Sequence, residues 1–209
     1  MTTVKQYDAL NRLTSITSAT GSVAVAAAAY TNNLANQRTA MALADGTSWA
    51  YQYDALGQVQ SGKKHWADGT VVPGEQFEYS HDNIGNRTST SVGGDQSGAG
   101  LRPATYAPNA LNQYTNRAVS SQVDVTGIAN ASTNVALTVT INGQGTTPYR
   151  HNEYFQALGS VGNSSGPVWA GVTVTRILTC PSFVRKTLSG FRSRWMIPFS
   201  CAVASPEAT

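Results

Sequence analysis

The chain has 209 residues, of which 41% are hydrophobic and 12% are charged, about half of the charged fraction usual for a soluble domain. So few charges exclude long helices held by Glu–Lys pairs and favour short strands joined by tight turns. The net charge of +3 comes from residues 176–209, since residues 1–175 hold nine basic and ten acidic residues. A basic stripe that would bind nucleic acid is therefore not expected.

A four-residue phrase with Asp or Asn first and Gly or Asn fourth recurs five times in the first 112 residues, at steps of 25, 21, 28 and 27 residues. Periods in this range are typical of repeat architectures. Asp or Asn bonds the backbone two residues on, and Gly or Asn accepts a positive φ, so each phrase predicts a strand, a tight turn and a strand. The copies are Asp8–Asn11, Asn33–Asn36, Asp54–Gly57, Asp82–Gly85 and Asn109–Asn112, and the polar residues that follow them are Arg12, Gln37, Gln58, Asn86 and Gln113.

A second turn signal lies between the phrases. Asp45-Gly46 and Asp68-Gly69 occur in the same context, Ala-Asp-Gly-Thr, and Asp-Gly between strands is a strong hairpin signal. Thr20-Gly21 and Gly93-Gly94-Asp95 take the corresponding place in other copies. Each repeat therefore predicts two strands and two turns. The alanine-rich run 23–30 has helix propensity, but its position between two turns favours a strand.

Downstream of the fourth phrase the pattern loosens. Residues 91–103 are rich in Gly and Ser and predict a longer loop or an insertion. From residue 119 the phrase is absent, but strand patterns continue. The run Val135–Ile141 ends at Asn142-Gly143, which again predicts a hairpin, and Val172–Thr175 predicts one more strand.

The last 34 residues have a different character. They are basic, carry three prolines, hold both cysteines, Cys180 and Cys201, and contain no phrase. The cysteine spacing, without a nearby His, fits no zinc site. We interpret 176–209 as an atypical tail that is disordered or arises from a change of reading frame.

Neither a secretion signal nor a membrane span is predicted. Met1–Gln6 leads directly into the first phrase without a charged and then apolar region. The longest apolar run, Val23–Tyr30, has eight residues, whereas a spanning helix needs roughly 20.

Two copies of the phrase carry a family resemblance. Tyr7-Asp8-Ala9-Leu10-Asn11-Arg12-Leu13 and Tyr53-Asp54-Ala55-Leu56-Gly57-Gln58-Val59 resemble the tyrosine–aspartate (YD) repeat of the RHS family, which runs Tyr-Asp, two residues, Gly, Arg and an apolar residue. The resemblance is clear over 7–117 and loose over 118–175. Three copies depart from it, with Asn32, His81 and Pro108 in place of the Tyr.

This resemblance implies an all-β fold: a repeat array of short antiparallel hairpins that forms part of a curved RHS-type shell strip, with a non-repeat C-terminal tail. The expected organisation is a YD-repeat array of about five copies in 1–117, a further strand-rich, shell-like segment in 118–175, and the tail in 176–209. The family's shell-closing core segment has no match in the chain, which therefore looks like a piece of a shell wall.

The resemblance also implies a function. In RHS proteins, bacterial toxin-complex components and teneurins, such shells enclose a carboxy-terminal polypeptide or serve in surface recognition. We expect a non-catalytic, encapsulating shell fragment related to bacterial polymorphic toxins or cell-surface proteins, with an extracellular or cell-surface location. Its partners would be an enclosed or neighbouring polypeptide of a larger RHS protein, or a surface glycan.

The alternative is an adhesin module that binds carbohydrate or protein. Trp49 and Trp66 are the possible ligand-facing aromatics, although aromatic residues in such strands more often pack on neighbouring strands. Glycan binding that is lost on their replacement would favour this alternative.

No catalytic residue, cofactor site or metal site is predicted. Each phrase supplies at most one carboxylate, from Asp8, Asp54 or Asp82, whereas calcium loops gather several oxygen donors. No nucleophile elbow, phosphate loop or zinc-protease motif occurs in the sequence. A hydrolase with scattered carboxylates is the weakest alternative. Because an open strip leaves unpaired strand edges, we also expect self-association.

Overall fold

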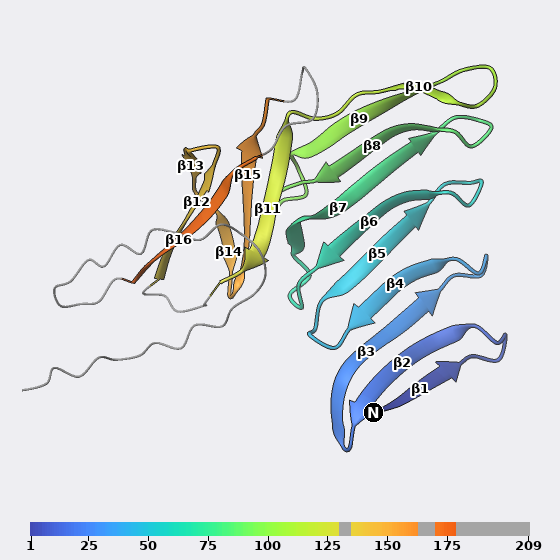
Figure 1. Cartoon of the computed structure of the whole chain (residues 1–209). Coiled ribbons are helices and arrows are strands. Elements are labelled where there is room, and N and C mark those ends of the chain that lie inside the picture. The colour runs from blue at the N-terminus through green and yellow to red at the C-terminus, as the bar shows by residue number, and fades with distance from the viewer. Residues whose placement is uncertain (130–134, 163–169, 179–209) are drawn as a thin grey trace, which may run out of the picture.

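The computed structural model describes residues 1–129, 135–162 and 170–178, and every regular element in these ranges is a β-strand. The first ten strands form one antiparallel sheet in which each strand pairs with the next along the chain (Figure 1). This confirms the predicted all-β array of short antiparallel hairpins. The strands are β1 (Thr2–Tyr7), β2 (Leu13–Thr20), β3 (Val23–Asn32), β4 (Arg38–Leu43), β5 (Ser48–Tyr53), β6 (Val59–His65), β7 (Val71–His81), β8 (Arg87–Gly93), β9 (Leu101–Pro108) and β10 (Tyr114–Arg117).

The alanine-rich run is a strand, as predicted. It forms most of β3, whose backbone pairs with β2 on one side and β4 on the other. Two ladders of inter-strand hydrogen bonds outweigh the preference of alanine for helix, because propensity is a weak prior against tertiary context.

The five phrases form the turns that join successive strands at one end of the strands, and a β-bulge lies beside each of these turns. The strand pairing shifts register next to every phrase, for example between Gln52 and Tyr53. An extra residue in one strand bends that strand and increases its twist. The other shifts lie at Gln6/Tyr7, Thr31/Asn32, Ser80/His81 and Tyr114/Asn116.

The remaining strands form a second unit of two three-stranded sheets. One sheet has the order β11 (Gln122–Ile128), β15 (Tyr154–Ser160), β14 (Tyr149–His151), and the other has the order β13 (Gln144–Thr146), β12 (Val135–Ile141), β16 (Val172–Leu178). Asn142 and Gly143 join β12 to β13 with φ of 50° and 79°, which confirms the predicted hairpin. The core between the sheets consists of Val139, Ile141, Phe155 and Ala157.

The stretch 91–103 contains the longer loop that its glycines and serines predict, since residues 94–100 connect β8, which ends at Gly93, to β9, which begins at Leu101. Between them lies a compact turn, in which the amide of Asp95 donates to the carbonyl of Ala99 at 2.8 Å and the amide of Gly98 donates to the carbonyl of Asp95 at 3.1 Å. The sequence Asp-x-x-Gly thus forms the same turn here as the repeated phrase does at the opposite end of the strands.

The boundary expected after residue 175 lies inside β16, which pairs with β12 up to Leu178. Residues 176–178 are therefore strand rather than tail. The rest of the expected tail, including both cysteines, lies outside the described residues.

Candidate binding surface

Each phrase forms a three-residue hairpin loop that its first side chain closes. In the first copy the amide of Asp8 donates to the carbonyl of Arg12 at 2.9 Å, and the amide of Asn11 donates to the carbonyl of Asp8 at 2.9 Å. The Oδ1 atom of Asp8 accepts the amides of Leu10 and Arg12, both at 2.9 Å. A type I turn followed by a left-handed residue is a favoured three-residue hairpin loop.

The fourth residue of every phrase has a positive φ. It is Asn11, Asn36 or Asn112, with φ of 61°, 61° and 59°, or Gly57 or Gly85, with φ of 82° and 91°. Only Gly and, less readily, Asn adopt this conformation without a large steric penalty. The choice of Gly or Asn is therefore a requirement of the backbone.

Hydrogen bonds lower the carboxyl pKa at several turns. The amide of Arg12 is the largest cause for Asp8, and the side-chain amide of Asn86 is the largest cause for Asp82. Both groups bond to the ionised carboxylate and favour it over the neutral acid. The side-chain hydroxyls of Thr47, Thr70 and Ser97 do the same for Asp45, Asp68 and Asp95.

The polar residue after each of the first four phrases reaches the turn that the next phrase forms. The Nη1 atom of Arg12 donates to the carbonyl of Asn33 at 2.9 Å, and the side chain of Asn86 donates to Asn112 at 3.1 Å. The side-chain nitrogens of Gln37 and Gln58 lie 3.1 Å from where a Cβ on Gly57 and on Gly85 would stand. These four contacts, which we call the turn ladder, tie each repeat to the next, and the polar residues noted in the sequence thereby acquire a structural role.

Each phrase carries an exposed aliphatic residue, at its third position in four copies and at its second position, Leu34, in the second copy. The exposed fractions are 74% for Leu10, 106% for Leu34, 71% for Leu56, 73% for Ile84 and 75% for Leu111. The turns that carry these residues lie side by side at the same end of the strands (Figure 1). Single exposed aliphatics are ordinary, but one in every phrase, four of them at the same position, makes a row of apolar side chains that the isolated sheet leaves uncovered.

The two faces of the sheet differ in chemistry. Residues paired across strands share a face, so the pairs Tyr51–Gly62 and Gly62–Phe77 place the two rings on the same face. The opposite face is polar: Ser61 donates to Gln52 at 3.1 Å, and Lys63 forms an ion pair with Glu78 at 2.9 Å.

The first face, which we call the aromatic–arginine face, carries stacked rings and cations. The Cζ of Arg38 lies 3.9 Å from the ring centre of Tyr30, and that of Arg87 lies 4.6 Å from the ring centre of Tyr79. A hydrogen bond from Thr90 lowers the pKa of the Tyr106 hydroxyl, and the nearby guanidinium of Arg117 lowers it further. The face consists of Tyr30, Trp49, Tyr51, Tyr53, Phe77, Tyr79, Tyr106, Arg38, Arg87 and Arg117.

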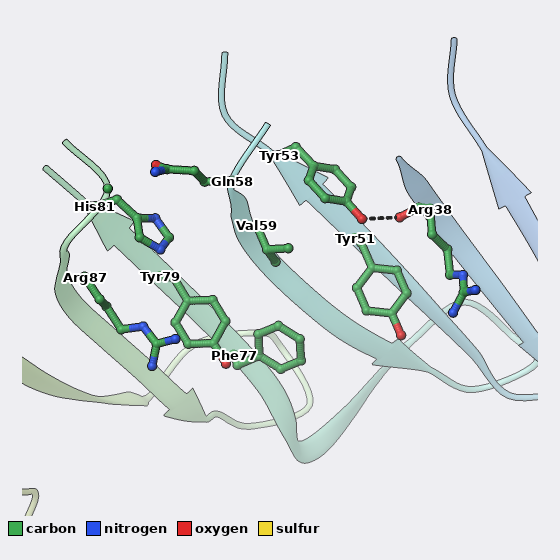
Figure 2. A pocket seen from close by; sticks show the side chains of 10 residues that line it. Arg38, Tyr51, Tyr53, Gln58, Val59, Phe77, Tyr79, His81 and Arg87 are labelled. Carbon is green, nitrogen blue, oxygen red and sulfur yellow. Dashed lines mark hydrogen bonds between the residues drawn. The ribbon is translucent and has the colours of Figure 1, made fainter. Parts of the chain in front are cut away.

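An open hollow of about 670 Å³ lies on this face. Figure 2 shows Arg38 at one end, Arg87 at the other, and Tyr51, Val59, Phe77 and Tyr79 between them. The hydroxyl of Tyr53 donates to the carbonyl of Arg38 at 2.7 Å and fixes that ring beside the hollow. Gln58, His81 and Gly85 complete the lining.

The two tryptophans singled out in the sequence lie in different places. Trp49 is part of the aromatic–arginine face, 6.2 Å from Tyr51 and 5.8 Å from Phe77 between ring centres. Trp66 stacks on His151 at 4.2 Å and meets Tyr154 edge-on at 5.4 Å. Both are half-buried against neighbours, and Trp66 contacts the second unit rather than the hollow.

Trp66 belongs to a joint between the sheet and the second unit that the sequence did not reveal. A wide bulge in β7 leaves Val72 1% exposed and brings Pro73 and Gly74 against β15. The hydroxyl of Tyr154 donates to the carbonyl of Pro73, and burial raises the pKa of that hydroxyl. A proline and a glycine within a strand are the available sequence signal for such a bulge.

A buried ion pair completes this joint. Arg102 of β9 donates to Asp124 of β11, and their side chains are 10% and 11% exposed. Gln156 of β15 donates to the other carboxylate oxygen of Asp124 at 2.7 Å. A buried carboxylate requires such partners, because an unpaired charge is costly away from water.

The sequence predicted neither a metal site nor a membrane span. Within residues 1–129, 135–162 and 170–178 no group of three or more His, Cys, Asp or Glu side chains gathers at one place. The same residues include no helix that is long and apolar enough to cross a membrane.

No protein-family model matches the chain, and no curated protein matches it. Solved structures do. A crystal structure of TcdB2-TccC3-Cdc42 is similar over 84% of this chain, with 14% sequence identity and a TM-score of 0.50. A crystal structure of TcdB2-TccC3-TEV matches over 84% at 14% identity and a TM-score of 0.44. The Tc holotoxin pore of Photorhabdus luminescens, with a mutated TccC3, matches over 84% at 15% identity and a TM-score of 0.39.

The likeness to TcdB2-TccC3-Cdc42 concerns the fold. This chain spans 9% of that chain, so a small part of a much larger toxin-complex protein has the same arrangement of strands. The likeness agrees with the RHS-type shell strip expected from the YD phrases.

Proposed function

We propose that this chain is a non-catalytic wall segment of an RHS-type shell that encloses or displays another polypeptide. The single observation that carries the proposal is the open ten-stranded hairpin sheet, in which every second turn is an Asx-x-x-Gly/Asn loop tied to the next by the turn ladder. The fold likeness to TcdB2-TccC3-Cdc42 supports the same assignment.

The architecture suits a wall better than a catalyst. A meander with a uniform pair of strands per repeat can be lengthened without changing its local contacts, as in other repeat proteins. Its two faces need no further protein layer, since one is polar and the other is lined by stacked rings and arginines. Such a sheet separates two spaces, which is the task of a shell wall.

The test is the structure of the longest natural reading frame that contains residues 1–178, determined by electron microscopy. The proposal requires that a strand from outside these residues pairs with β1 and that the strip curves around a closed space. A finished assembly in which the edge of β1 pairs with nothing would contradict it. Protease resistance of a polypeptide encoded in the same frame would then separate enclosure from display.

A second candidate is a binding module of the cell surface, favoured by one observation. The hollow on the aromatic–arginine face is open, and two of the side chains that line it, Arg38 and Arg87, are exposed cations. Glycan-array binding by the protein, abolished by Trp49→Ala but retained in Lys63→Gln on the polar face, would support this candidate. Trp66→Ala is a poorer probe, because Trp66 also holds the second unit.

A further inference from the structure

The hollow on the aromatic–arginine face has the features of a ligand site that the wall proposal does not use. It lies across strands β4 to β8, with arginine at both ends and apolar groups between (Figure 2). Four inter-strand steps of about 4.8 Å separate the two end strands, so the arginines lie roughly 19 Å apart along the sheet.

The charge of the hollow is positive. Arg38 and Arg87 are exposed, and no acidic side chain lines the hollow. In the part of the chain that the structure describes, the ion pairs are formed by Arg12, Lys63 and Arg102, so neither arginine of the hollow is neutralised by a carboxylate. Each guanidinium packs on a tyrosine. Arg87 also bonds the hydroxyl of Tyr106, and a guanidinium has five N–H donors, so both arginines can still donate to an anionic group.

The rings of the hollow are arranged for packing rather than for stacking on a sugar. The guanidinium of Arg87 lies over one face of Tyr79 in the hollow, and that of Arg38 lies over one face of Tyr30 beside it. Phe77 lies flat over Gly62, since a Cβ on Gly62 would stand 2.1 Å from its ring. What remains open is the outer side of Phe77 beside Val59, an apolar floor for an aliphatic or aromatic side chain.

Two polar atoms of the lining lack a partner. Oε1 of Gln58 and Nδ1 of His81 are buried without a hydrogen bond among the described residues. Buried polar atoms are normally paired, so these two side chains are the polar groups of the lining with hydrogen-bonding capacity left unused by the described residues.

We propose that this hollow binds an extended polypeptide segment with an apolar side chain between two acidic groups. The acidic groups would meet Arg38 and Arg87, and the apolar side chain would lie on Phe77 and Val59. Because an extended chain rises about 3.3 Å per residue, the two acidic positions are about six residues apart. This deepens the proposed function by naming the chemistry of the polypeptide that the wall faces, and it rests on that function only for its biological setting.

The experiment measures fluorescence polarisation of a labelled peptide with the full chain. The peptide carries two pairs of glutamates about six residues apart, with Leu and Phe between them. Exposed charge pairs contribute up to about 1 kcal/mol, so we expect Arg38→Gln and Arg87→Gln each to weaken binding about three- to fivefold. The double variant should weaken it about tenfold or more. The matched control is Lys63→Gln, which removes one cation from the polar face and should leave binding unchanged.

The other outcomes overturn the proposal in distinct ways. Equal binding by a peptide with glycines in place of Leu and Phe would exclude the apolar floor. A sulfated oligosaccharide that binds as tightly through the same arginines would replace the polypeptide by an acidic glycan. Absence of binding, or binding that is indifferent to both arginines, would remove the site altogether. None of these results depends on shell assembly, so the wall proposal can stand or fall separately.

Discussion

The ten-stranded sheet and the second unit are both antiparallel, but different interactions hold them together. In the second unit two sheets face each other across a dry core, where Val139 is 0% exposed and Ile141 is 2% exposed. In the sheet, β1 is exposed along its whole length, and every side chain of β2 to β5 is half-buried or exposed. Cross-strand pairs, turns and the turn ladder replace a core there. A repeat protein can therefore extend at small cost for each repeat, but it depends on its neighbours for stability.

The largest expected effect is in the core of the second unit. We expect Ile141→Ala to destabilise that unit by about 2–5 kcal/mol, because it leaves a cavity between the two sheets. Hydrogen exchange should become faster in β12 and β15 and stay unchanged in β1 to β4. The control Leu56→Ala removes a side chain that is 71% exposed in a turn of the sheet and should change stability by less than about 0.5 kcal/mol.

The next largest effect concerns the glycine under Phe77. A Cβ on Gly62 would stand 2.1 Å from the Phe77 ring, so we expect Gly62→Ala to cost about 1–3 kcal/mol through overpacking. Adding Phe77→Ala should recover part of this cost in a double-mutant cycle. The control Gly145→Ala places a methyl group where no atom lies within 4 Å. Equal losses of stability in Gly62→Ala and Gly145→Ala would show that overpacking against the Phe77 ring is not the cause of the loss in Gly62→Ala.

A smaller effect comes from the turns. Gly57 has φ of 82°, and an alanine there would adopt a left-handed conformation that costs about 1–2 kcal/mol. Gly57→Asn should cost much less, since asparagine occupies the same position in three other copies. Urea denaturation of both variants measures the difference. A loss that is the same for alanine and asparagine would show that the positive φ is not what selects glycine here.

The smallest expected effect of a single residue on stability is electrostatic. Hydrogen bonds lower the carboxyl pKa of Asp8, Asp82 and Asp95 from 3.8, and a lowered folded-state pKa stabilises the fold above the unfolded value. This stabilisation is complete above about pH 5 and is lost as the pH falls below 3.8 towards the folded pKa values. The protection factors of amides in the turns, which correct for the pH dependence of intrinsic exchange, should therefore fall on acidification before those in β12 fall.

The variant Asp82→Asn isolates this contribution. An asparagine can accept the same two backbone amides, as Asn109 does in its own turn, whereas the titration is removed together with the carboxylate oxygen that accepts from the side chain of Asn86. The acid sensitivity of the fourth turn should disappear in this variant while the other turns keep theirs. Unchanged acid sensitivity at that turn would contradict the assigned cause.

The local chemistry of the chain was enough to predict the strands and turns of the sheet. Asp and Asn at the first position of a phrase and Gly or Asn at the fourth determine their own backbone, so neighbours along the chain suffice. In the loop that connects β8 to β9 the same chemistry applies, since Oδ1 of Asp95 accepts the amides of Ser97 and Ala99.

The contacts that build the candidate surface could not be predicted in the same way. The ring of Phe77 meets Gly62 across a strand pair, and the same combination recurs where Phe155 covers Gly127. Both depend on register, which no single segment specifies. The joint through Tyr154 and Pro73 connects residues 81 positions apart, and only the bulge in β7 makes it possible.

The central claim is that the sheet is an open array whose first edge is free to receive another strand. The most direct measurement is light scattering of the full chain during size exclusion at tens of micromolar. The account predicts oligomers whose mass rises with concentration. Val4→Lys should reduce them by placing a charge on the edge strand, whereas Val25→Lys in β3 should not, although the two valines are similarly exposed, at 54% and 62%. A clean monomer at these concentrations would contradict the account.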